Sequence, residues 1–203
     1  MRVETARRVF GDQFGLAQRY VDLLIKRGVD RGLIGPREVH RVWPRHILNS
    51  VAIADLIDQG GSVLDVGSGA GLPGIPLAIL RPDLSVTLLE PLLRRHTFLV
   101  EVVGELGLGD RVTVVRGRAE DHRERYPVVT ARAVAGLAKL LDWCGPLVAP
   151  KGEFLAIKGE SAERELVEVQ KYLRNRGLSG EVLTATAHPD AEPTWVIRVA
   201  DRR

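Results

Sequence analysis

The most restrictive feature of the sequence is an alternation of short apolar runs and helix-like segments that begins at residue 62. Five runs belong to strand–helix units, and the last two have only a loop between them. The runs span residues 62–66, 85–89, 111–115, 128–131, 153–157, 181–187 and 195–199. Because a helical crossover makes successive strands parallel, this order predicts an α/β fold with a mostly parallel, seven-stranded sheet and helices on both faces. The terminal hairpin predicts a last strand that runs antiparallel to its neighbour.

The first 60 residues have a different pattern. Apolar residues recur at helical spacing at Phe14, Ala17, Val21 and Leu24. Glycines and a proline interrupt this helix between residues 28 and 36, and a second helix is predicted over residues 46–58. We therefore expect an N-terminal helical extension, residues 1–60, and one compact domain over residues 61–203.

The N-terminal segment is basic although the whole chain is nearly balanced. Its first 50 residues contain ten Lys or Arg and five Asp or Glu, whereas the formal net charge of the chain is only +3. Five of the 29 basic residues are lysines, so most of the charge is guanidinium, which suits phosphate contacts and stacking on bases. The segment is either a nucleic-acid contact or a solvated helix face, and charge alone does not separate these interpretations.

Composition excludes several other classes. One cysteine, Cys144, rules out a disulfide framework and a cysteine-rich zinc site. No uncharged apolar stretch is long enough for a transmembrane helix, and the start has no apolar signal-peptide core. We expect a cytoplasmic protein without a metal site, and a monomer.

A glycine-rich loop is the strongest local signal. The run from Val63 ends at Gly67, and Gly69 and Gly71 follow, at the carboxyl end of a predicted parallel strand where ligands bind in such sheets. Asp65 lies two residues before the first glycine, and Glu90 ends the next strand, where a carboxylate can accept hydrogen bonds from ribose hydroxyls. A tight turn and an exposed strand-end acid are the plainer interpretations.

Two nucleotide-containing cofactors fit such a loop. The pattern G-x-G-x-x-G fails from Gly67, because Leu72 is at the sixth position; from Gly69 it matches only three residues past the strand. Pro73 and Pro76 also lie in the turn that would cradle a pyrophosphate. The form acid-x-Gly-x-Gly-x-Gly therefore favours S-adenosylmethionine, and a nicotinamide-dependent oxidoreductase remains the alternative.

Further blocks give a close resemblance to one family. They are Arg45–Ser50 (RHILNS), Asp65–Leu77 (DVGSGAGLPGIPL), Arg118–Glu120 (RAE), Ala131–Ala133 (ARA) and Ala156–Gly159 (AIKG). In this order they resemble the bacterial RsmG (GidB) family over roughly residues 14–175, and seven strands with the last reversed are the Rossmann-like arrangement of class I methyltransferases. The resemblance implies transfer of a methyl group from S-adenosyl-L-methionine to N7 of a guanine in the decoding-region loop of 16S ribosomal RNA. Loss of that activity is associated in the family with low-level streptomycin resistance.

The resemblance also implies positions in the site. Carried over residue by residue, the cofactor contacts would be Gly67, Leu72, Ala119, Glu120 and Arg132. The general logic of the fold adds Glu90, Gly69 and Asp65. The family's usual segment before the Arg-His block is not recognisable at residues 27–44, so the N-terminal RNA contacts carry over least directly. The partner implied is 16S ribosomal RNA, free, in the 30S subunit or in an assembly precursor.

Methylation at guanine N7 needs no general base, because N7 has a free lone pair and no proton. The task is mainly one of orientation, for which Arg132 and Lys158 are the candidates, and Arg45 and His46 are candidate RNA contacts. The Asn/Asp-Pro-Pro-aromatic loop typical of exocyclic-amine methylation is absent, and we expect Cys144 in the core rather than as a nucleophile. We expect Trp143 and Trp195 in the core too; only Trp43 lies in the basic segment. A further alternative is an RNA-binding protein without methyl transfer.

Overall fold

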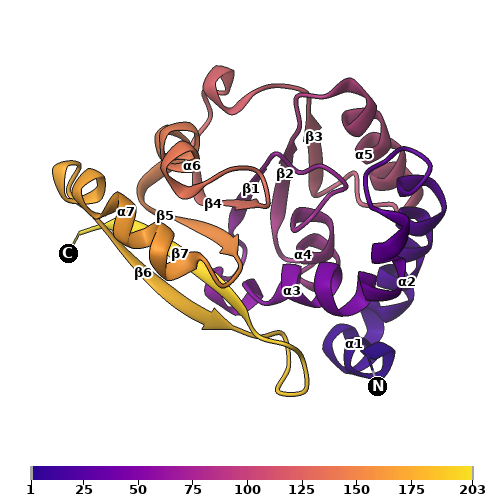
Figure 1. The fold of residues 1–203 in the computed structure, drawn as a ribbon. Helices are drawn as coiled ribbons and strands as arrows, with labels where there is room; N and C mark the ends of the chain where they lie inside the picture. The colour runs from indigo at the N-terminus through magenta and orange to yellow at the C-terminus, as the bar shows by residue number, and fades with distance from the viewer. Residues whose placement is uncertain (1, 203) are drawn as a thin grey trace.

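The computed structural model describes residues 2–202 and contains a seven-stranded sheet of order β3-β2-β1-β4-β5-β7-β6 (Figure 1). Strands β1 to β5 are parallel, and β7 runs antiparallel to both of its neighbours, β5 and β6. The strands are β1 Ser62–Val66, β2 Ser85–Leu89, β3 Val112–Val115, β4 Tyr126–Arg132, β5 Val148–Lys158, β6 Leu178–Ala185 and β7 Thr194–Asp201. The predicted seven-stranded class I arrangement is confirmed.

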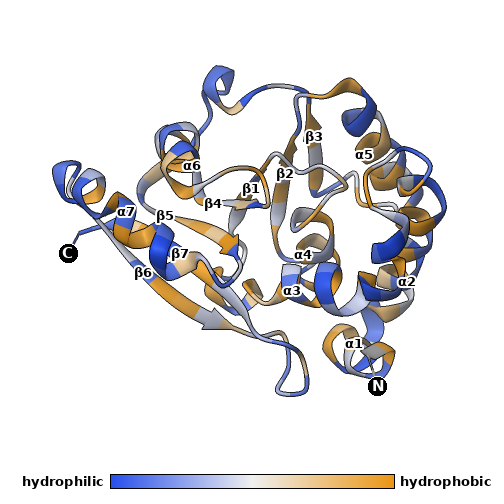
Figure 2. Cartoon of the chain, in the orientation of Figure 1, coloured by the Kyte–Doolittle hydropathy of each residue, from blue (hydrophilic) through white to orange (hydrophobic). Residues whose placement is uncertain are grey.

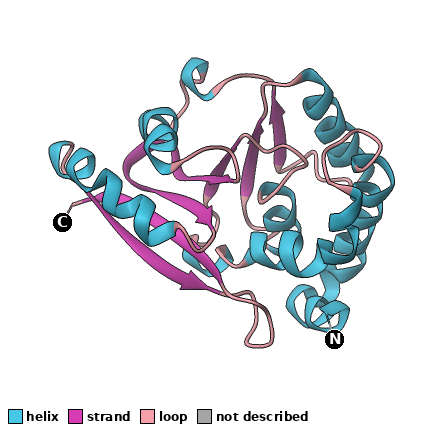
Figure 3. Ribbon diagram, in the orientation of Figure 1, coloured by secondary structure: helices cyan, strands magenta, loops and turns pink. Residues whose placement is uncertain are grey.

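Helices and helical turns account for most of the remaining chain (Figure 3). The longer helices are α1 Arg2–Phe10, α2 Phe14–Leu23, α4 Gly74–Leu80, α5 Leu93–Glu105, α6 Leu137–Cys144 and α7 Ala162–Asn175. Short or wide helical turns are η1 Gly11–Gln13, η2 Leu24–Gly28, η3 Pro36–Arg41, η4 Val42–Leu48, α3 Asn49–Val51, η5 Ala54–Leu56, η6 Ala119–Asp121 and η7 Gly145–Leu147.

Alternate residues of the strands build two separate cores, one on each face of the sheet. In β1, Val63 belongs to the core beneath the N-terminal helices, α4 and α5, whereas Leu64 belongs to the core beneath α6 and α7. This alternation follows from the two-residue period of a strand. Figure 2 shows apolar residues along the strands and on the helices that cover them. Helices therefore cover both faces of the sheet, and the ends of its strands remain accessible to a ligand.

The N-terminal helices share a core with the sheet. Tyr20 and Leu24 are fully buried in the core that includes α4 and α5, and the Tyr20 hydroxyl donates a hydrogen bond to the Ala70 carbonyl at 2.9 Å. The predicted extension over residues 1–60 thus packs as part of one body with residues 61–203, and the boundary itself stays a prediction.

Part of the N-terminal basic charge is used for this packing. Arg27 forms ion pairs with Glu101 and Glu105 of α5, and Arg31 pairs with Glu101 at 2.8 Å. Arg19 donates to the Glu105 carbonyl at 2.6 Å. These three guanidinium groups hold the helices to α5, so the basic composition of the segment overstates its free positive surface.

The second N-terminal helix differs from its prediction over residues 46–58. A 3₁₀ turn, Pro36–Arg41, leads directly into a wide π-type turn, Val42–Leu48, the helix ends at Val51, and a separate short turn covers Ala54–Leu56. Pro44 lies inside this stretch and has no N–H to donate, so a regular ladder of helical hydrogen bonds cannot form there. The structure also contains α1, which was not predicted.

Within residues 2–202, no helix is long and apolar enough to cross a membrane. In the same range, no three His, Cys, Asp or Glu side chains come close enough together to hold a metal ion.

Candidate active site

The glycine loop after β1 requires residues without side chains. Gly67 has φ of +70° and Gly71 has φ of +97°, a region that favours glycine. A Cβ at Gly67 would lie 2.8 Å from the Val134 side chain, and one at Gly71 would lie 2.3 Å from Ile75. The backbone of the loop therefore forms the floor of the site, closely covered by the segment that follows β4.

Asp65 lies beneath this loop. Its side chain is fully buried, and Oδ2 accepts a hydrogen bond from the N–H of Gly74, the first residue of α4, at 3.0 Å. Burial raises the pKa of the Asp65 carboxyl to about 7, against the opposing effect of the Gly74 hydrogen bond. Asp65 thus fixes where α4 begins, and we expect it to act on a ligand through the loop backbone.

Glu90 connects the glycine loop to the chain after β2. Its side chain is 1% exposed; Oε2 accepts from the N–H of Gly69 and Oε1 from the N–H of Leu92, both at 2.9 Å. Each carboxylate oxygen keeps a second lone pair after these bonds. Glu90, which the sequence predicts to bind a ribose, thus also connects the glycine loop to the segment after β2.

A cavity of about 240 Å³ opens above these walls, here called the loop cavity. Its lining includes Gly67, Leu92, Ala119, Glu120, Val134 and Trp143. Three of the predicted cofactor residues are therefore brought together, from the ends of β1 and β3. Leu72 is half-buried at the far end of the glycine loop, outside this lining.

A second cavity of about 450 Å³, here called the basic cavity, lies beside the first. Four positively charged side chains line it, together with a half-buried aromatic and an amide: Arg41, Arg45, Arg132, Lys158, Trp195 and Asn49. Two acids, Glu160 and Glu192, lie on its rim. Ala133, which has φ of +54°, borders the basic cavity, and the next residue, Val134, borders the loop cavity. The segment after β4 is therefore the partition between the two cavities.

Arg132, at the end of β4, ties this partition to the N-terminal helices. Nη1 donates to the His46 carbonyl and to Ser50 Oγ, both at 2.8 Å, and Nη2 donates to the Arg45 carbonyl at 2.7 Å. Among the described residues, no carboxylate lies within ion-pair distance of this guanidinium. Burial lowers its pKa to about 10. Arg132 thus places a half-buried positive charge at the junction of the cavities, held by neutral acceptors.

The two predicted RNA contacts differ in accessibility. The Arg45 side chain is 51% exposed and borders the basic cavity, with Glu38 Oε2 3.7 Å away. The His46 side chain is 15% exposed, and its Nδ1 lies 3.2 Å from Arg132 Nη2. Burial, followed by the charge of Arg132, lowers the His46 pKa to about 4. Arg45 is therefore placed to meet a ligand, whereas His46 supports the turn as a neutral imidazole.

The Lys158 side chain, at the end of β5, is also bound by other residues of the protein. Its Nζ donates to the Ala135 carbonyl and to Glu165 Oε2, both at 2.8 Å, and the side chain is 10% exposed. The same Glu165 oxygen accepts from the Leu137 N–H at 2.8 Å. Because these bonds flank residues 133–136, Lys158 and Glu165 hold the partition from the side of α7.

The tryptophans match their prediction in part, because Trp143 and Trp195 pack against the core beneath α6 and α7. Trp43 of the basic segment is buried, stacked on Phe14 at 5.5 Å between ring centroids. Trp143 and Trp195, predicted in the core, are half-buried and line the loop cavity and the basic cavity respectively. The prediction of Cys144 in the core is confirmed, and burial raises its thiol pKa to about 12, which keeps it protonated.

The site residues that the sequence did not single out come from three segments: Val134, Glu165 and Asn49. Asn49 could have been found from spacing, because Arg41, Arg45 and Asn49 are four residues apart and face the same cavity. Nothing local in the sequence marks Val134 or Glu165, whose positions depend on how β4 and α7 pack.

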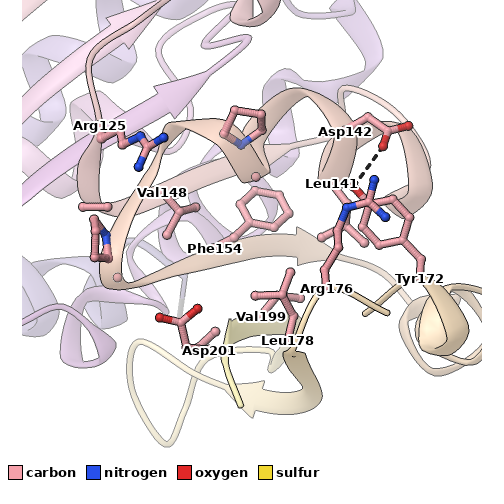
Figure 4. A pocket seen from close by; sticks show the side chains of 16 residues that line it. Arg125, Leu141, Asp142, Val148, Phe154, Tyr172, Arg176, Leu178, Val199 and Asp201 are labelled. Atoms are coloured by element: carbon pink, nitrogen blue, oxygen red, sulfur yellow. Dashed lines mark hydrogen bonds between the residues drawn. The ribbon is translucent and has the colours of Figure 1, made fainter. Parts of the chain in front are cut away.

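A larger cavity, of about 510 Å³, lies elsewhere (Figure 4). It is bordered by Val148 and Phe154 of β5, near the amino ends of β4 and β5, where Arg176 stacks on Tyr172 at 3.7 Å and the Tyr172 hydroxyl donates to Asp142. Ligands of open parallel sheets bind at the opposite edge, outside the carboxyl ends of the strands. Size alone therefore does not identify the active site of this fold.

The sheet order with its reversed β7, the glycine loop after β1 and the carboxylate after β2 define a class I methyltransferase fold. The family model described as GidB, rRNA small subunit methyltransferase G, matches residues 13–191. The chain belongs to this family.

Relatives at high identity agree with the family model. Ribosomal RNA small subunit methyltransferase G of Kineococcus radiotolerans is 53% identical over 201 residues, covering 98% of this chain and 79% of the relative. The protein of the same name from Streptomyces avermitilis is 58% identical over 177 residues, covering 86% and 74%.

Solved structures with the same fold are more distant in sequence. TYW2 of M. jannaschii, solved in complex with AdoMet, has a TM-score of 0.56 and 20% identity, covering 74% of this chain and 71% of that one. This likeness concerns the fold.

Proposed function

We propose that this protein transfers a methyl group from S-adenosyl-L-methionine to N7 of a guanine in the decoding-region loop of 16S ribosomal RNA. The observation that carries the proposal is the pair of adjoining cavities at the carboxyl edge of the sheet, separated only by residues 133–134. Family membership supplies the reaction class, and the basic lining of the second cavity suits a nucleic acid.

The loop cavity suits the nucleoside part of the methyl donor. Its apolar lining of Leu92, Ala119, Val134 and Trp143 can enclose an adenine, and Glu120 lies at its rim. Glu90 accepts hydrogen bonds from the N–H groups of Gly69 and of Leu92, a lining residue, and each of its oxygens keeps a lone pair for a ribose hydroxyl. We assign Gly67 and Gly69 to the part of the backbone that lies closest to the methyl donor. When bound, S-adenosylmethionine supplies an electrophilic methyl group on a sulfonium.

Residues toward the basic cavity would hold the rest of the donor and the acceptor. Arg132 offers a positive charge at the junction. Leu72 lines neither cavity, and its assignment to the methyl donor follows from the family's pattern alone. Arg45 is exposed toward the basic cavity for an RNA phosphate. Lys158 acts through the partition, because its ammonium is already bound to Glu165 and Ala135.

The proposed reaction requires no general acid or base from the protein. Guanine N7 attacks through its lone pair and loses no proton, so the protein contributes alignment of the two reactants. The pKa values agree with this: His46 is neutral above about pH 4 and Cys144 stays protonated, so neither is poised as a base or a nucleophile at neutral pH. The fixed partition at residues 133–136 is the element that sets the approach.

The sequence leaves two alternatives, an oxidoreductase and an RNA-binding protein without methyl transfer. The family and the fold are those of methyltransferases, so nothing supports a nicotinamide-dependent oxidoreductase. A protein that binds RNA without methyl transfer is separated only by experiment. We further propose that the chain acts in the cytoplasm as a monomer, without a metal, on 16S ribosomal RNA or on the 30S subunit or its precursor.

The test is transfer of labelled methyl from S-adenosylmethionine to 30S subunits and to protein-free 16S ribosomal RNA, with the labelled nucleoside identified. Label in 7-methylguanosine supports the proposal, and the better substrate shows at which assembly stage the protein acts. Label in another nucleoside rejects the proposed position. Binding of both ligands without label identifies an RNA-binding protein that does not transfer methyl groups.

A further inference from the structure

One helical face lines the basic cavity with three side chains. Arg41 ends η3, Arg45 lies in η4 and Asn49 begins α3, and all three border this cavity. Residues four apart lie on one face of a helix, so Asn49 stands one turn beyond the exposed guanidinium of Arg45. Arg132 fixes this turn through the Arg45 and His46 carbonyls, which gives the Asn49 side chain a defined position.

The Asn49 side chain carries an unsatisfied buried oxygen. Within residues 2–202, three buried side-chain atoms make no hydrogen bond: Asn49 Oδ1, His46 Nε2 and Asp65 Oδ1. A buried acceptor without a donor destabilises the folded protein, so each such group in a native structure needs an explanation. The other two have one, because His46 Nε2 faces Glu38 at 3.3 Å and Asp65 can take up a proton. A carboxamide has no charged state and cannot be relieved by titration.

Three neighbouring donor side chains are already committed. Ser50 Oγ donates to the His46 carbonyl at 2.5 Å, and the two Arg132 Nη atoms donate to acceptors on the same turn. The Lys158 ammonium is bound to Ala135 and Glu165. Arg41 and Arg45, which border the same cavity, also leave Asn49 Oδ1 unpaired, so a ligand that enters the basic cavity can supply its donor. The terminal torsion of an asparagine is soft, so a small rotation can turn the amide toward such a ligand.

We propose that Asn49 recognises the acceptor base, its amide oxygen accepting a hydrogen bond from the N1–H or the 2-amino group of guanine. This inference rests on the proposed function and names its base-reading residue. Guanine carries these two donors on its Watson–Crick edge, whereas N7 lies on the opposite, Hoogsteen edge. A protein that holds the first edge therefore leaves N7 free for the methyl donor. Adenine has an acceptor at N1 and no 2-amino group. Its one Watson–Crick donor, the 6-amino group, lies where guanine has O6, so an adenine held in the same orientation cannot make the same bond.

The first experiment compares Asn49→Ala with Asn49→Asp in methyl transfer to 16S ribosomal RNA. We expect Asn49→Ala to lower kcat/KM roughly tenfold or more, while the affinity for S-adenosylmethionine stays unchanged and the melting temperature does not fall, because the variant removes an unsatisfied oxygen. Asn49→Asp should stay within about threefold of the native protein, because a carboxylate oxygen accepts the same bond. Gln18→Ala is the matched control: this amide lies on α2, bonded to Asp22, outside the cavity.

A second experiment measures the binding of guanosine and adenosine monophosphates to the whole chain by calorimetry. The native protein should prefer guanosine monophosphate, and Asn49→Ala should lose that preference. Equal binding of both nucleotides by the native protein, or a preference retained in Asn49→Ala, would overturn the inference. So would a parallel loss of S-adenosylmethionine binding and stability.

The two experiments separate this inference from the proposed function. If no 7-methylguanosine forms although the guanosine preference depends on Asn49, the proposed reaction fails and the base-reading role stands. If Asn49→Ala methylates guanine N7 at the native rate, the reaction stands and the role of Asn49 is rejected.

Discussion

The loop cavity and the basic cavity are neighbours, but they are built in opposite ways. The loop cavity is lined mostly by short stretches that follow β1, β2 and β3, with Val134 and Trp143 added from beyond β4, and the Glu90 carboxylate accepts hydrogen bonds from the N–H groups of Gly69 and Leu92. The basic cavity combines the N-terminal turn, the ends of β4 and β5 and the start of β7, and its cations dominate. A small cofactor site can thus be encoded locally, whereas a site for a large substrate depends on docking distant segments.

The largest effect is expected from Glu90→Ala, which should weaken cofactor binding and leave RNA binding nearly unchanged. Replacing Glu90 with Ala leaves the buried N–H groups of Gly69 and Leu92 without an acceptor, so S-adenosylmethionine binding should weaken by about 100-fold. RNA affinity should change less than about twofold. Calorimetry with the cofactor and filter binding with RNA measure the two, and the exposed Glu163→Ala serves as control. Native cofactor affinity in Glu90→Ala would remove this carboxylate from the site.

The next effect concerns the connection between the cavities. Arg132→Met removes the guanidinium that binds the Arg45 and His46 carbonyls, and should lower the free energy of unfolding by about 2 kcal/mol and weaken RNA binding. Arg132→Lys should restore only part of the loss, because one ammonium cannot reproduce the planar fork. Urea denaturation and RNA binding provide the readouts. Full rescue by lysine would mean that charge alone matters at this position.

A smaller effect is expected on the basic side alone. Arg45→Glu should weaken RNA binding by about tenfold and reduce its dependence on salt, because a phosphate contact is lost, with cofactor affinity unchanged. The exposed Arg164→Glu on α7 is the matched charge reversal away from the cavity. If both variants bind RNA equally well, the cavity does not contact phosphate through Arg45.

The smallest effect is a pH dependence that belongs to the loop side. The pKa of Asp65 is about 7 when folded and near its ordinary value of 3.8 when unfolded, so the folded state binds the proton more tightly. The stabilising contribution is therefore present at low pH and is lost as pH rises from about 4 to 7. Asp65→Asn should flatten this dependence and stabilise the protein at pH 8 relative to the native chain, on the order of 1 kcal/mol. Urea denaturation at pH 5 and pH 8 checks it; an unchanged pH dependence would contradict it.

The same contrast explains what could be predicted from the sequence. β1 and β2 match their predicted bounds, because short apolar runs between turn residues determine both, and of the residues marked around the glycine loop only Gly67 lines the loop cavity itself. The path of the N-terminal segment could not be predicted, since Pro44 and the bonds to Arg132 decide it. The sequence also did not indicate that Trp195, which packs against the core, reaches the basic cavity as well, because that depends on the pairing of β7 with β5.

The direction of β7 has a consequence for how the acceptor side can change. Because β7 is reversed, Trp195 pairs with Lys158, so the β6–β7 loop, residues 186–193, returns to the edge that carries both cavities (Figure 1). Its last residues, Glu192 and Pro193, border the basic cavity. Hairpin loops tolerate insertion and replacement without altering the strands they join. The loop at residues 186–193 can therefore change in length and sequence. Such changes would alter the basic cavity and leave the loop cavity intact.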